Sequence, residues 1–199
     1  MKLRMIAAIV VLIIGSAIIS GIVVAQSCAM EGGVRKSVVK VGDKVFDFSI
    51  TTLDGKTVKL SELQKDKKRT EKGIIILSFW CTTCHSCRHV DAQLGKLVQD
   101  YSKQAIVLAL DANSADTAPV IEAFLKKTGT ALPVAIDANC NAADLFGITK
   151  TTTTVVIDGD GVLRYCGQFK QKGGGSAEDA LKAVLAGREV SVKTTPHKG

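Results

Sequence analysis

A continuous apolar run at residues 74–80 (IIILSFW) ends at a cysteine cluster, and the hydrophobic period changes there. An uninterrupted apolar stretch of this length is typical of a strand that is covered on both faces of a sheet. Beyond Cys84 the apolar residues fall on one stripe of an amphipathic helix, at Val90, Leu94, Leu97, Val98 and Tyr101. A buried strand that leads directly into such a helix restricts this part of the chain to α/β structure.

The same alternation of strand and helix patterns continues along the chain. Strands are predicted at residues 44–50 (KVFDFSI), 105–110, 134–136, 153–157 and 162–165, and residues 52–60 hold a Leu-Asp-Gly-Lys turn followed by a short strand. Helices are predicted at residues 115–128, 142–146 and 176–186. The last two strands flank the turn sequence Asp-Gly-Asp-Gly at 158–161, which favours a hairpin, and Ser176 with Asp179 resembles a capping box. This order predicts an α/β sandwich with a mixed sheet.

The N-terminus carries a separate targeting signal. Residues 6–25 form a run of twenty residues without a charge, which is long enough to cross the hydrocarbon core of a bilayer. Lys2 and Arg4 precede the run, so the positive-inside rule places the N-terminus in the cytoplasm and the rest of the chain on the far side. Cleavage after Ser27, or lipidation at Cys28, are the alternatives to an uncleaved anchor. All three deliver the domain across the membrane.

The expected domain organisation follows from these boundaries. We expect an anchor or signal segment at residues 1–27, a linker at 28–40, one domain at 41–190 and a flexible tail at 191–199. The chain has 26 basic and 19 acidic residues, and the excess is spread out except for a run at 65–72. Because no aromatic residues interleave with that run, it predicts a solvated loop and no nucleic-acid partner.

Six cysteines in an exported chain are informative, because disulfides persist in that compartment. Three of them, Cys81, Cys84 and Cys87, fall in one short stretch, FWCTTCHSC, which contains two overlapping Cys-x-x-Cys pairs. The domain is large enough to fold around an apolar core without covalent staples, so the cluster indicates a functional site. A helix beginning near Cys84 would place that sulfur at its N-terminus, where free N–H groups and the helix dipole favour a thiolate. This favours the 84/87 pair over the 81/84 pair.

The stretch resembles the redox motif of thioredoxin-like redoxins, and most closely the membrane-tethered TlpA/ResA type, which is related to the AhpC/TSA proteins. In that group Phe-Trp is followed by three residues and then by the redox pair, which matches Cys84-His-Ser-Cys87 here. Further similar pieces are Val41-Gly-Asp, Leu53-Asp-Gly and the closing segment 155–167. The resemblance covers roughly residues 40–187 and implies a three-layer thioredoxin-like sandwich.

The resemblance also implies roles for the residues of the motif. Cys84 would be the attacking thiolate, and Cys87 the thiol that resolves the mixed disulfide. His85 would lie close enough to favour the thiolate of Cys84, and Trp80 would pack beside the site. Cys81 would be either an additional redox thiol or a buried thiol at the strand end. No organic cofactor would be required.

The same resemblance implies a place and partners for the reaction. The domain would be an extracytoplasmic thiol–disulfide oxidoreductase, held at the membrane and acting on the thiols and disulfides of exported proteins. Apocytochromes c and copper-site proteins are the partner classes that the group implies, together with a membrane redox partner that recycles the pair. The direction of electron flow depends on the reduction potentials of the couple and its partner.

A metal site is the main rival interpretation of the same residues. Cys81, Cys84, Cys87 and His89 are soft ligands within nine residues, which suits copper(I) or another soft metal held by a metallochaperone of the same fold. One departure from the family leaves room for this interpretation. Thr152 occupies the place of the cis-proline that family members carry beside the redox pair.

Haem attachment and peroxidase chemistry each depend on a single feature. Cys-Thr-Thr-Cys-His at 81–85 fits covalent haem attachment, although a strand running into the first cysteine leaves little room for haem. A peroxidase would want a proline ahead of the reactive cysteine, and none lies between Gly73 and Pro119.

Two further pairs of residues have roles that the sequence leaves open. Cys140 and Cys166 are candidates for a structural disulfide or for two buried thiols, since free cysteine is among the most buried residue types. Asp47 and Asp111 are weaker candidates for the proton acceptor of the resolving thiol.

Overall fold

The computed structural model describes residues 38–170 and 175–196. Its seven strands form one sheet in the order β2-β1-β5-β4-β3-β6-β7, in which β3, β4 and β5 run parallel and the other neighbours are antiparallel. The strands are β1 (Ser49–Thr52), β2 (Thr57–Lys59), β3 (Thr70–Trp80), β4 (Lys103–Asp111), β5 (Val134–Ile136), β6 (Thr153–Ile157) and β7 (Leu163–Gln168). The mixed sheet predicted from the sequence is confirmed.

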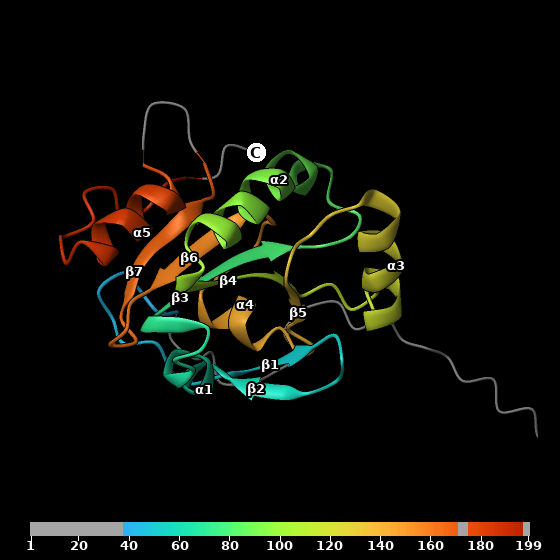
Figure 1. The fold of residues 1–199 in the computed structure, drawn as a ribbon, viewed down its shortest axis with the longest axis horizontal. Helices are drawn as coiled ribbons and strands as arrows, with labels where there is room; N and C mark the ends of the chain where they lie inside the picture. Colours follow the sequence, from blue (N-terminus) through green and yellow to red (C-terminus); the bar gives the residue numbers. More distant parts are fainter. Residues whose placement is uncertain (1–37, 171–174, 197–199) are drawn as a thin grey trace, which may run out of the picture.

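Helices cover both faces of this sheet and complete a three-layer sandwich (Figure 1). They are α1 (Leu60–Lys65), α2 (His85–Asp100), α3 (Ala118–Thr128), α4 (Asn141–Leu145) and α5 (Ala177–Leu185). One core contains residues of α1 and α4, and the other contains residues of α2, α3 and α5. Each face of the sheet therefore has its own apolar layer.

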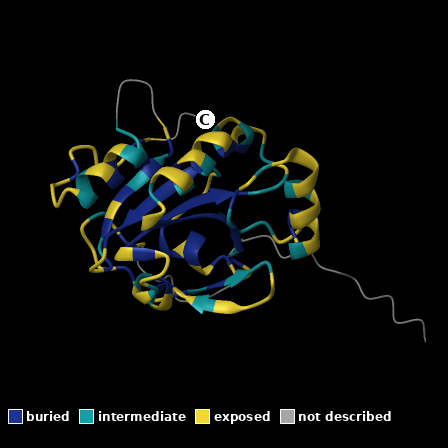
Figure 2. Cartoon of the chain, in the orientation of Figure 1, coloured by how far each residue is buried: buried dark blue, intermediate teal, exposed yellow. Residues whose placement is uncertain are grey.

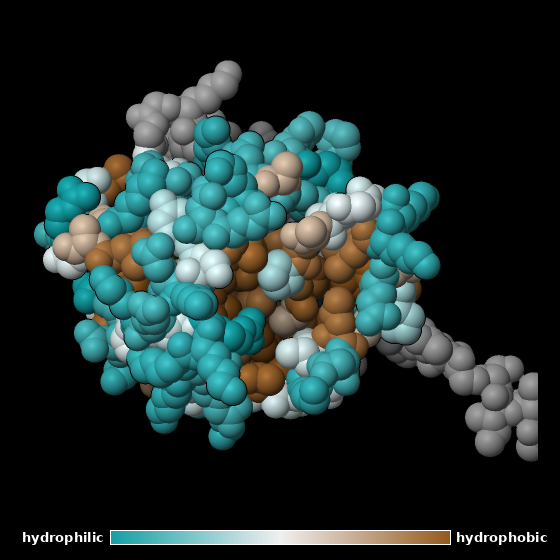
Figure 3. All heavy atoms as spheres, viewed as in Figure 1, coloured by the Kyte–Doolittle hydropathy of each residue, from teal (hydrophilic) through white to brown (hydrophobic). Residues whose placement is uncertain are grey.

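The position of β3 in the middle of the sheet, between two layers of helices, explains why its sequence is apolar without interruption. Ile75, Leu77 and Phe79 belong to the core beneath α1 and α4, whereas Ile74 and Ile76 belong to the core beneath α2 and α5. Successive side chains of a strand point to opposite faces, so both faces of β3 need apolar residues. Figure 2 shows the resulting buried centre, with exposed residues on the outer sides of the helices. Figure 3 shows hydrophilic side chains over most of this face and hydrophobic ones in a hollow at its middle.

Most elements agree with the sequence prediction, and one strand does not. The helix after the cysteines, the hairpin of β6 and β7, and the Ser176 capping box of α5 are confirmed. The strand predicted at 44–50 is wrong for residues 44–48, because β1 begins only at Ser49. Lys44 makes an isolated bridge to Val162, and the N–H of Val45 donates to Gly161, so this part runs along the closing hairpin instead.

The C-terminal segment, residues 193–195, is ordered against the edge of the sheet, unlike the flexible tail expected from 191 onward. Thr194 forms a parallel bridge with Cys166 of β7, and the N–H of Cys166 donates to Lys193. Thr195 is buried, and a Cβ atom added to Gly167 would clash with its Oγ1. Glycine is therefore needed at position 167 for the close approach of this segment. Residues 197–199 lie outside the described residues.

The expected anchor at 6–25 and Cys28, with its alternative fates, also lie outside the described residues. Within residues 38–170 and 175–196, no helix combines the length and apolar character needed to cross a membrane.

Candidate active site

The redox motif lies where β3 ends and α2 begins, on the edge of the sheet that also carries the end of β4. Cys84 is the N-cap residue of α2, with extended backbone at φ −73° and ψ 108°. Residues 81–84 form a turn in which the N–H of Cys84 donates to the carbonyl of Cys81 at 3.3 Å. The strand, the turn and the helix start are consecutive in sequence, so local structure alone brings this site together.

Cys84 and Cys87 form a disulfide, with their Cα atoms 5.3 Å apart. This is the pairing that the sequence favoured over 81/84, and Cys81 is a free thiol. The two bonded sulfurs differ in access, because Cys84 is half-buried whereas Cys87 is 1% exposed. The N–H of Cys87 donates to the Sγ atom of Cys84 at 3.0 Å. A helix N-terminus thus directs a donor at the more accessible sulfur, which stabilises negative charge there when the bond is open.

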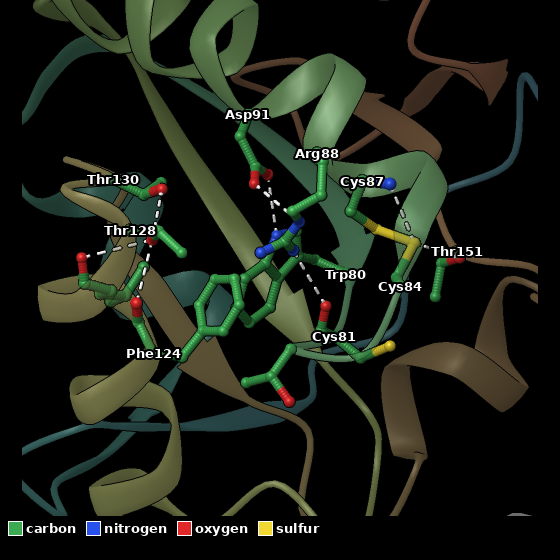
Figure 4. A network of polar contacts seen from close by, with 12 residues as sticks. Trp80, Cys81, Cys84, Cys87, Arg88, Asp91, Phe124, Thr128, Thr130 and Thr151 are labelled. Atoms are coloured by element: carbon green, nitrogen blue, oxygen red, sulfur yellow. Dashed lines mark hydrogen bonds and ion pairs between the residues drawn. A yellow bond between two sulfur atoms is a disulfide. The ribbon is translucent and has the colours of Figure 1, made fainter.

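A second polar group reaches the same sulfur from the loop before β6. The Thr151 hydroxyl lies 3.1 Å from the Sγ atom of Cys84, and Figure 4 shows its side chain directed at the disulfide. The neighbouring Thr152, in the place of the family's proline, has a φ of 64° and no direct sulfur contact among the described bonds. Its N–H donates to the carbonyl of Phe79 at 2.6 Å. A proline could not supply that donor, so this loop is built differently from the family pattern.

Trp80 packs beside the site, as expected, within a buried network that the sequence did not reveal (Figure 4). Its indole Nε1–H donates to Asp91 at 2.9 Å, and Asp91 forms an ion pair with Arg88 at 3.2 Å. The Arg88 guanidinium lies over the ring of Trp80, 5.1 Å from its centroid, and over Phe124 at 4.2 Å. Burial raises the pKa of the Asp91 carboxyl, against the lowering effects of the indole hydrogen bond and the Arg88 charge.

The Arg88 network also holds the turn that precedes the disulfide. An Nη2–H of Arg88 donates to the carbonyl of Cys81 at 3.2 Å. Because Arg88 follows Cys87 on the first turn of α2, it joins the helix to the link between β3 and the redox pair. In Figure 4 its side chain extends away from the disulfide, so its contacts support the link and do not touch the sulfurs.

The remaining thiol of the cluster lines a pocket beside the redox pair. Cys81 is half-buried, and its sulfur lies 3.5 Å from the Thr83 hydroxyl. The pocket has a volume of about 400 Å³ and is bounded by Cys81, Thr151 and apolar side chains that include Phe79 and Leu110. Cys81 is therefore neither sealed in the sheet nor bonded to Cys84.

The two histidines of the motif lie at the surface, and the suggested metal ligands are not brought together. His85 and His89 are exposed on the first turns of α2, with ring centroids 5.3 Å apart. Across the described parts of the chain, no group of three or more His, Cys, Asp or Glu residues is placed to hold a metal ion. In this oxidised form, Cys84 and Cys87 are bonded to each other, so the set of Cys81, Cys84, Cys87 and His89 is not assembled.

The structural disulfide suggested for Cys140 and Cys166 does not form. Cys140 is disulfide-bonded, whereas Cys166 is a free thiol on β7, so the two are not partners. Burial raises the pKa of the Cys166 thiol. Cys166 is half-buried, pairs side by side with Thr194 of the C-terminal segment, and packs against the core on the side of α1 and α4.

The two aspartates considered as proton acceptors have different surroundings. Asp47 accepts from the N–H and hydroxyl of Ser61 at the start of α1, at 3.0 and 2.8 Å, so it supports a helix start. Asp111 is completely buried at the end of β4, in register with Trp80 of β3. Burial raises the pKa of the Asp111 carboxyl to about 8, although a hydrogen bond from the N–H of Asn113 acts to lower it.

Solved structures with a similar fold show to which class of fold this domain belongs. A structure named as thiol:disulfide interchange protein DsbE, from Chlorobium tepidum, superposes with a TM-score of 0.60 at 25% identity, covering 74% of this chain and 99% of that one. A thioredoxin-like protein from Aeropyrum pernix superposes with a TM-score of 0.53 at 22% identity, over 71% of this chain and 89% of that one, which supports the fold alone. The expected thioredoxin-like sandwich is confirmed.

Sequence comparison gives the family. Thiol-disulfide oxidoreductase ResA of Halalkalibacterium halodurans is 28% identical over 151 residues, which are 75% of this chain and 78% of that protein. The protein of the same name from Bacillus thuringiensis (strain Al Hakam) is 30% identical over 127 residues, or 63% of this chain and 68% of that protein. The model of the AhpC/TSA family matches residues 41–166. With that match over more than half of its length, the chain belongs to the AhpC/TSA family.

Proposed function

We propose that this protein is a membrane-anchored thiol–disulfide oxidoreductase that exchanges disulfides with exported proteins on the far side of the membrane. The observation that carries the exchange activity is the asymmetric disulfide at the start of α2. One sulfur, that of Cys84, is accessible and receives hydrogen bonds, and the other, that of Cys87, is buried behind it. This arrangement suits a reaction in which one cysteine meets the partner and the other completes the exchange.

The reduction of a partner proceeds in two balanced steps. The Cys84 thiolate attacks one sulfur of the partner's disulfide, which forms a mixed disulfide and releases the partner's other sulfur as a thiolate that takes up a proton. The Cys87 thiol then loses its proton and attacks the Cys84 sulfur, which releases the second partner thiol. Two electrons pass to the partner, and the Cys84–Cys87 disulfide found in the structure is formed again. Oxidation of a partner is the reverse sequence.

The groups around Cys84 favour it as the attacking sulfur. When the disulfide opens, the N–H of Cys87 and the hydroxyl of Thr151 both lie within hydrogen-bond distance of its Sγ atom. Donors directed at a thiolate stabilise its charge, which raises the thiolate fraction at neutral pH. Thr151 is thus proposed as a catalytic residue that the sequence did not single out.

The proposed location rests on the N-terminal sequence, and the proposed partners rest on the family resemblance. The twenty-residue uncharged run and the preceding Lys2 and Arg4 support an anchor with a cytoplasmic N-terminus. Exported proteins with cysteine pairs, such as apocytochromes c or copper-site proteins, are the partners that the family resemblance suggests. A membrane redox partner would return the Cys84–Cys87 couple to its starting state. A membrane-impermeant thiol reagent applied to whole cells should label Cys81, and labelling only after lysis would contradict this location.

The exchange activity is tested with two matched variants of the full chain. Cys87→Ser should form a stable mixed disulfide with a disulfide-bonded model peptide, because the second step is blocked. Cys84→Ser should form none and should lose exchange activity. Full activity of Cys84→Ser would refute the assignment of the attacking sulfur. Stoichiometric copper in the purified protein, with all three clustered thiols protected from alkylation, would favour a metallochaperone instead.

A further inference from the structure

A buried pair of carboxyl groups lies beneath the link between β3 and the redox pair. Asp116 is 6% exposed and accepts two hydrogen bonds from Thr82, one from its N–H at 2.8 Å and one from its hydroxyl at 2.6 Å. Thr82 lies in the turn of residues 81–84 that places Cys84. The Asp116 carboxylate therefore holds this turn at both the backbone and the side chain of one residue.

The carboxyl of Asp111 neighbours that of Asp116, and one of its oxygens has no hydrogen-bond partner. Its side chain is completely buried, its Oδ1 atom accepts from the N–H of Asn113 at 2.8 Å, and its Oδ2 atom has no partner when both carboxyls are ionised. A carboxylate oxygen left unpaired in the interior is costly. A proton on Asp111 removes that cost, because the protonated carboxyl can donate to Asp116, and this hydrogen bond acts to raise the pKa of Asp111 and to lower that of Asp116.

The two carboxyl groups have different surroundings, which decides where the proton lies. Burial raises the pKa of Asp111, and the charge of Asp116 acts in the same direction. Burial acts to raise the pKa of Asp116 as well, but the hydrogen bonds from Thr82, Asp111 and Asn113 together outweigh it, and the net shift is downward. Two adjacent buried carboxyls cannot both ionise without strong repulsion.

The remaining charged groups near the pair are engaged elsewhere. The N–H of Asp137 donates to the Asp111 carbonyl, while the Asp137 carboxylate accepts from the first N–H groups of α4. Arg88 bonds to the Cys81 carbonyl and to Asp91. Asp144 and Lys150 line the neighbouring pocket with Asn113. The charge that acts on Asp111 is that of Asp116.

We propose that Asp111 and Asp116 share one proton and act as positioning residues, so that the pair clamps Thr82 and thereby sets the turn that presents Cys84 to a partner. This inference rests on the proposed exchange function and extends it to groups that do not touch the sulfurs. The clamp is intact while Asp111 holds its proton. When Asp111 ionises, repulsion between the two carboxylates disturbs Asp116 and releases its hold on the turn.

The sign of the pH effect follows from the proton on Asp111. The folded state binds this proton more tightly than the unfolded chain does, so folding stability conferred by the pair is lost as the pH rises from about 4 towards about 8. Asp111→Asn keeps a neutral group that can donate to Asp116 at every pH. It should therefore remove this component of the pH dependence while leaving the clamp in place.

The test compares four variants of the full chain in the reduction of a disulfide-bonded model peptide from pH 6 to 9.5. The wild-type rate divided by the Asp111→Asn rate should be near one at pH 6. This ratio should fall three- to tenfold by pH 9.5, with a midpoint near pH 8. Asp116→Asn and Thr82→Val should be about fivefold slower than wild type at pH 7, and Thr82→Ser, which keeps the hydroxyl, should be within twofold. A constant ratio across the pH range, or full activity in Asp116→Asn and Thr82→Val, would overturn the proposal.

Two further measurements separate the clamp from the exchange function. If the wild-type protein has no exchange activity, the proposed function fails, but the urea midpoint measured at pH 6 and 9 still tests the pair. The midpoint should fall over that range in the wild type and by less in Asp111→Asn. If Asp111→Asn does not fold, the carboxyl carbon of Asp111 can be titrated by NMR in the wild type. A midpoint below pH 6 would refute a shared proton.

Discussion

Returning the family's proline to position 152 should destabilise this protein. Thr152 has a φ of 64°, whereas a proline ring fixes φ near −65°, so Thr152→Pro cannot keep the present backbone. The substitution also removes the N–H that donates to the carbonyl of Phe79, a residue that is 3% exposed. Loss of a partner by a buried carbonyl costs about 1–3 kcal/mol, and the forced change of φ adds about 1–3 kcal/mol. We expect a total loss of about 2–6 kcal/mol.

Thr152→Gly is the matched control for this prediction, because it keeps the N–H and suits a positive φ. Relief of the left-handed conformation contributes about 1 kcal/mol, and the greater freedom of glycine in the unfolded chain costs about 0.4–1 kcal/mol. The glycine variant should therefore lie within about 1 kcal/mol of wild type. Urea unfolding of the oxidised proteins measures both values, provided that the slope is unchanged. Equal midpoints for the proline and glycine variants would show that the loop does not depend on this N–H or on this φ.

Three more substitutions test individual contacts. Thr151→Val removes the hydroxyl beside Cys84 and should slow alkylation of the reduced Cys84 by iodoacetamide about fivefold at neutral pH, the equivalent of about 1 kcal/mol. Thr151→Ser keeps the hydroxyl and should not slow it. Equal rates for the valine variant and the wild type would exclude the hydroxyl as a donor. Asp91→Leu leaves the buried Trp80 indole N–H without an acceptor and removes the carboxylate partner of the half-buried Arg88. It should lower the unfolding free energy in urea by about 3 kcal/mol, against about 1 kcal/mol for Asp91→Asn. A loss below about 1 kcal/mol in the leucine variant would contradict this. Tyr165→Phe removes the hydroxyl that lies 2.9 Å from the Thr195 hydroxyl of the C-terminal segment. The change should speed hydrogen exchange of the amides of that segment about fivefold. An unchanged exchange rate would count against the contact.

The sequence alone predicted the central part of the site, because that part is local. The strand β3, the turn and the start of α2 are consecutive, so the change of hydrophobic period near Cys84 located the helix N-terminus. Helix geometry then placed the second cysteine of the 84/87 pair one turn further on, and the structure has that disulfide. The apolar run of β3 likewise predicted a sheet covered on both faces.

The tertiary structure decided everything that joins distant parts of the chain. Thr151 meets Cys84 across 67 residues, and Asp116 meets Thr82 across 34. No periodicity or spacing encodes these contacts, because the order of strands in the sheet determines which loops meet at the end of β3. The C-terminal segment looked flexible for the same reason, since its polar sequence gives no sign of the edge of β7 that it covers. The two cysteines of the disulfide could therefore be predicted from one short stretch, whereas the contacts of Thr151 and Asp116 with that stretch depend on the packing of the whole domain.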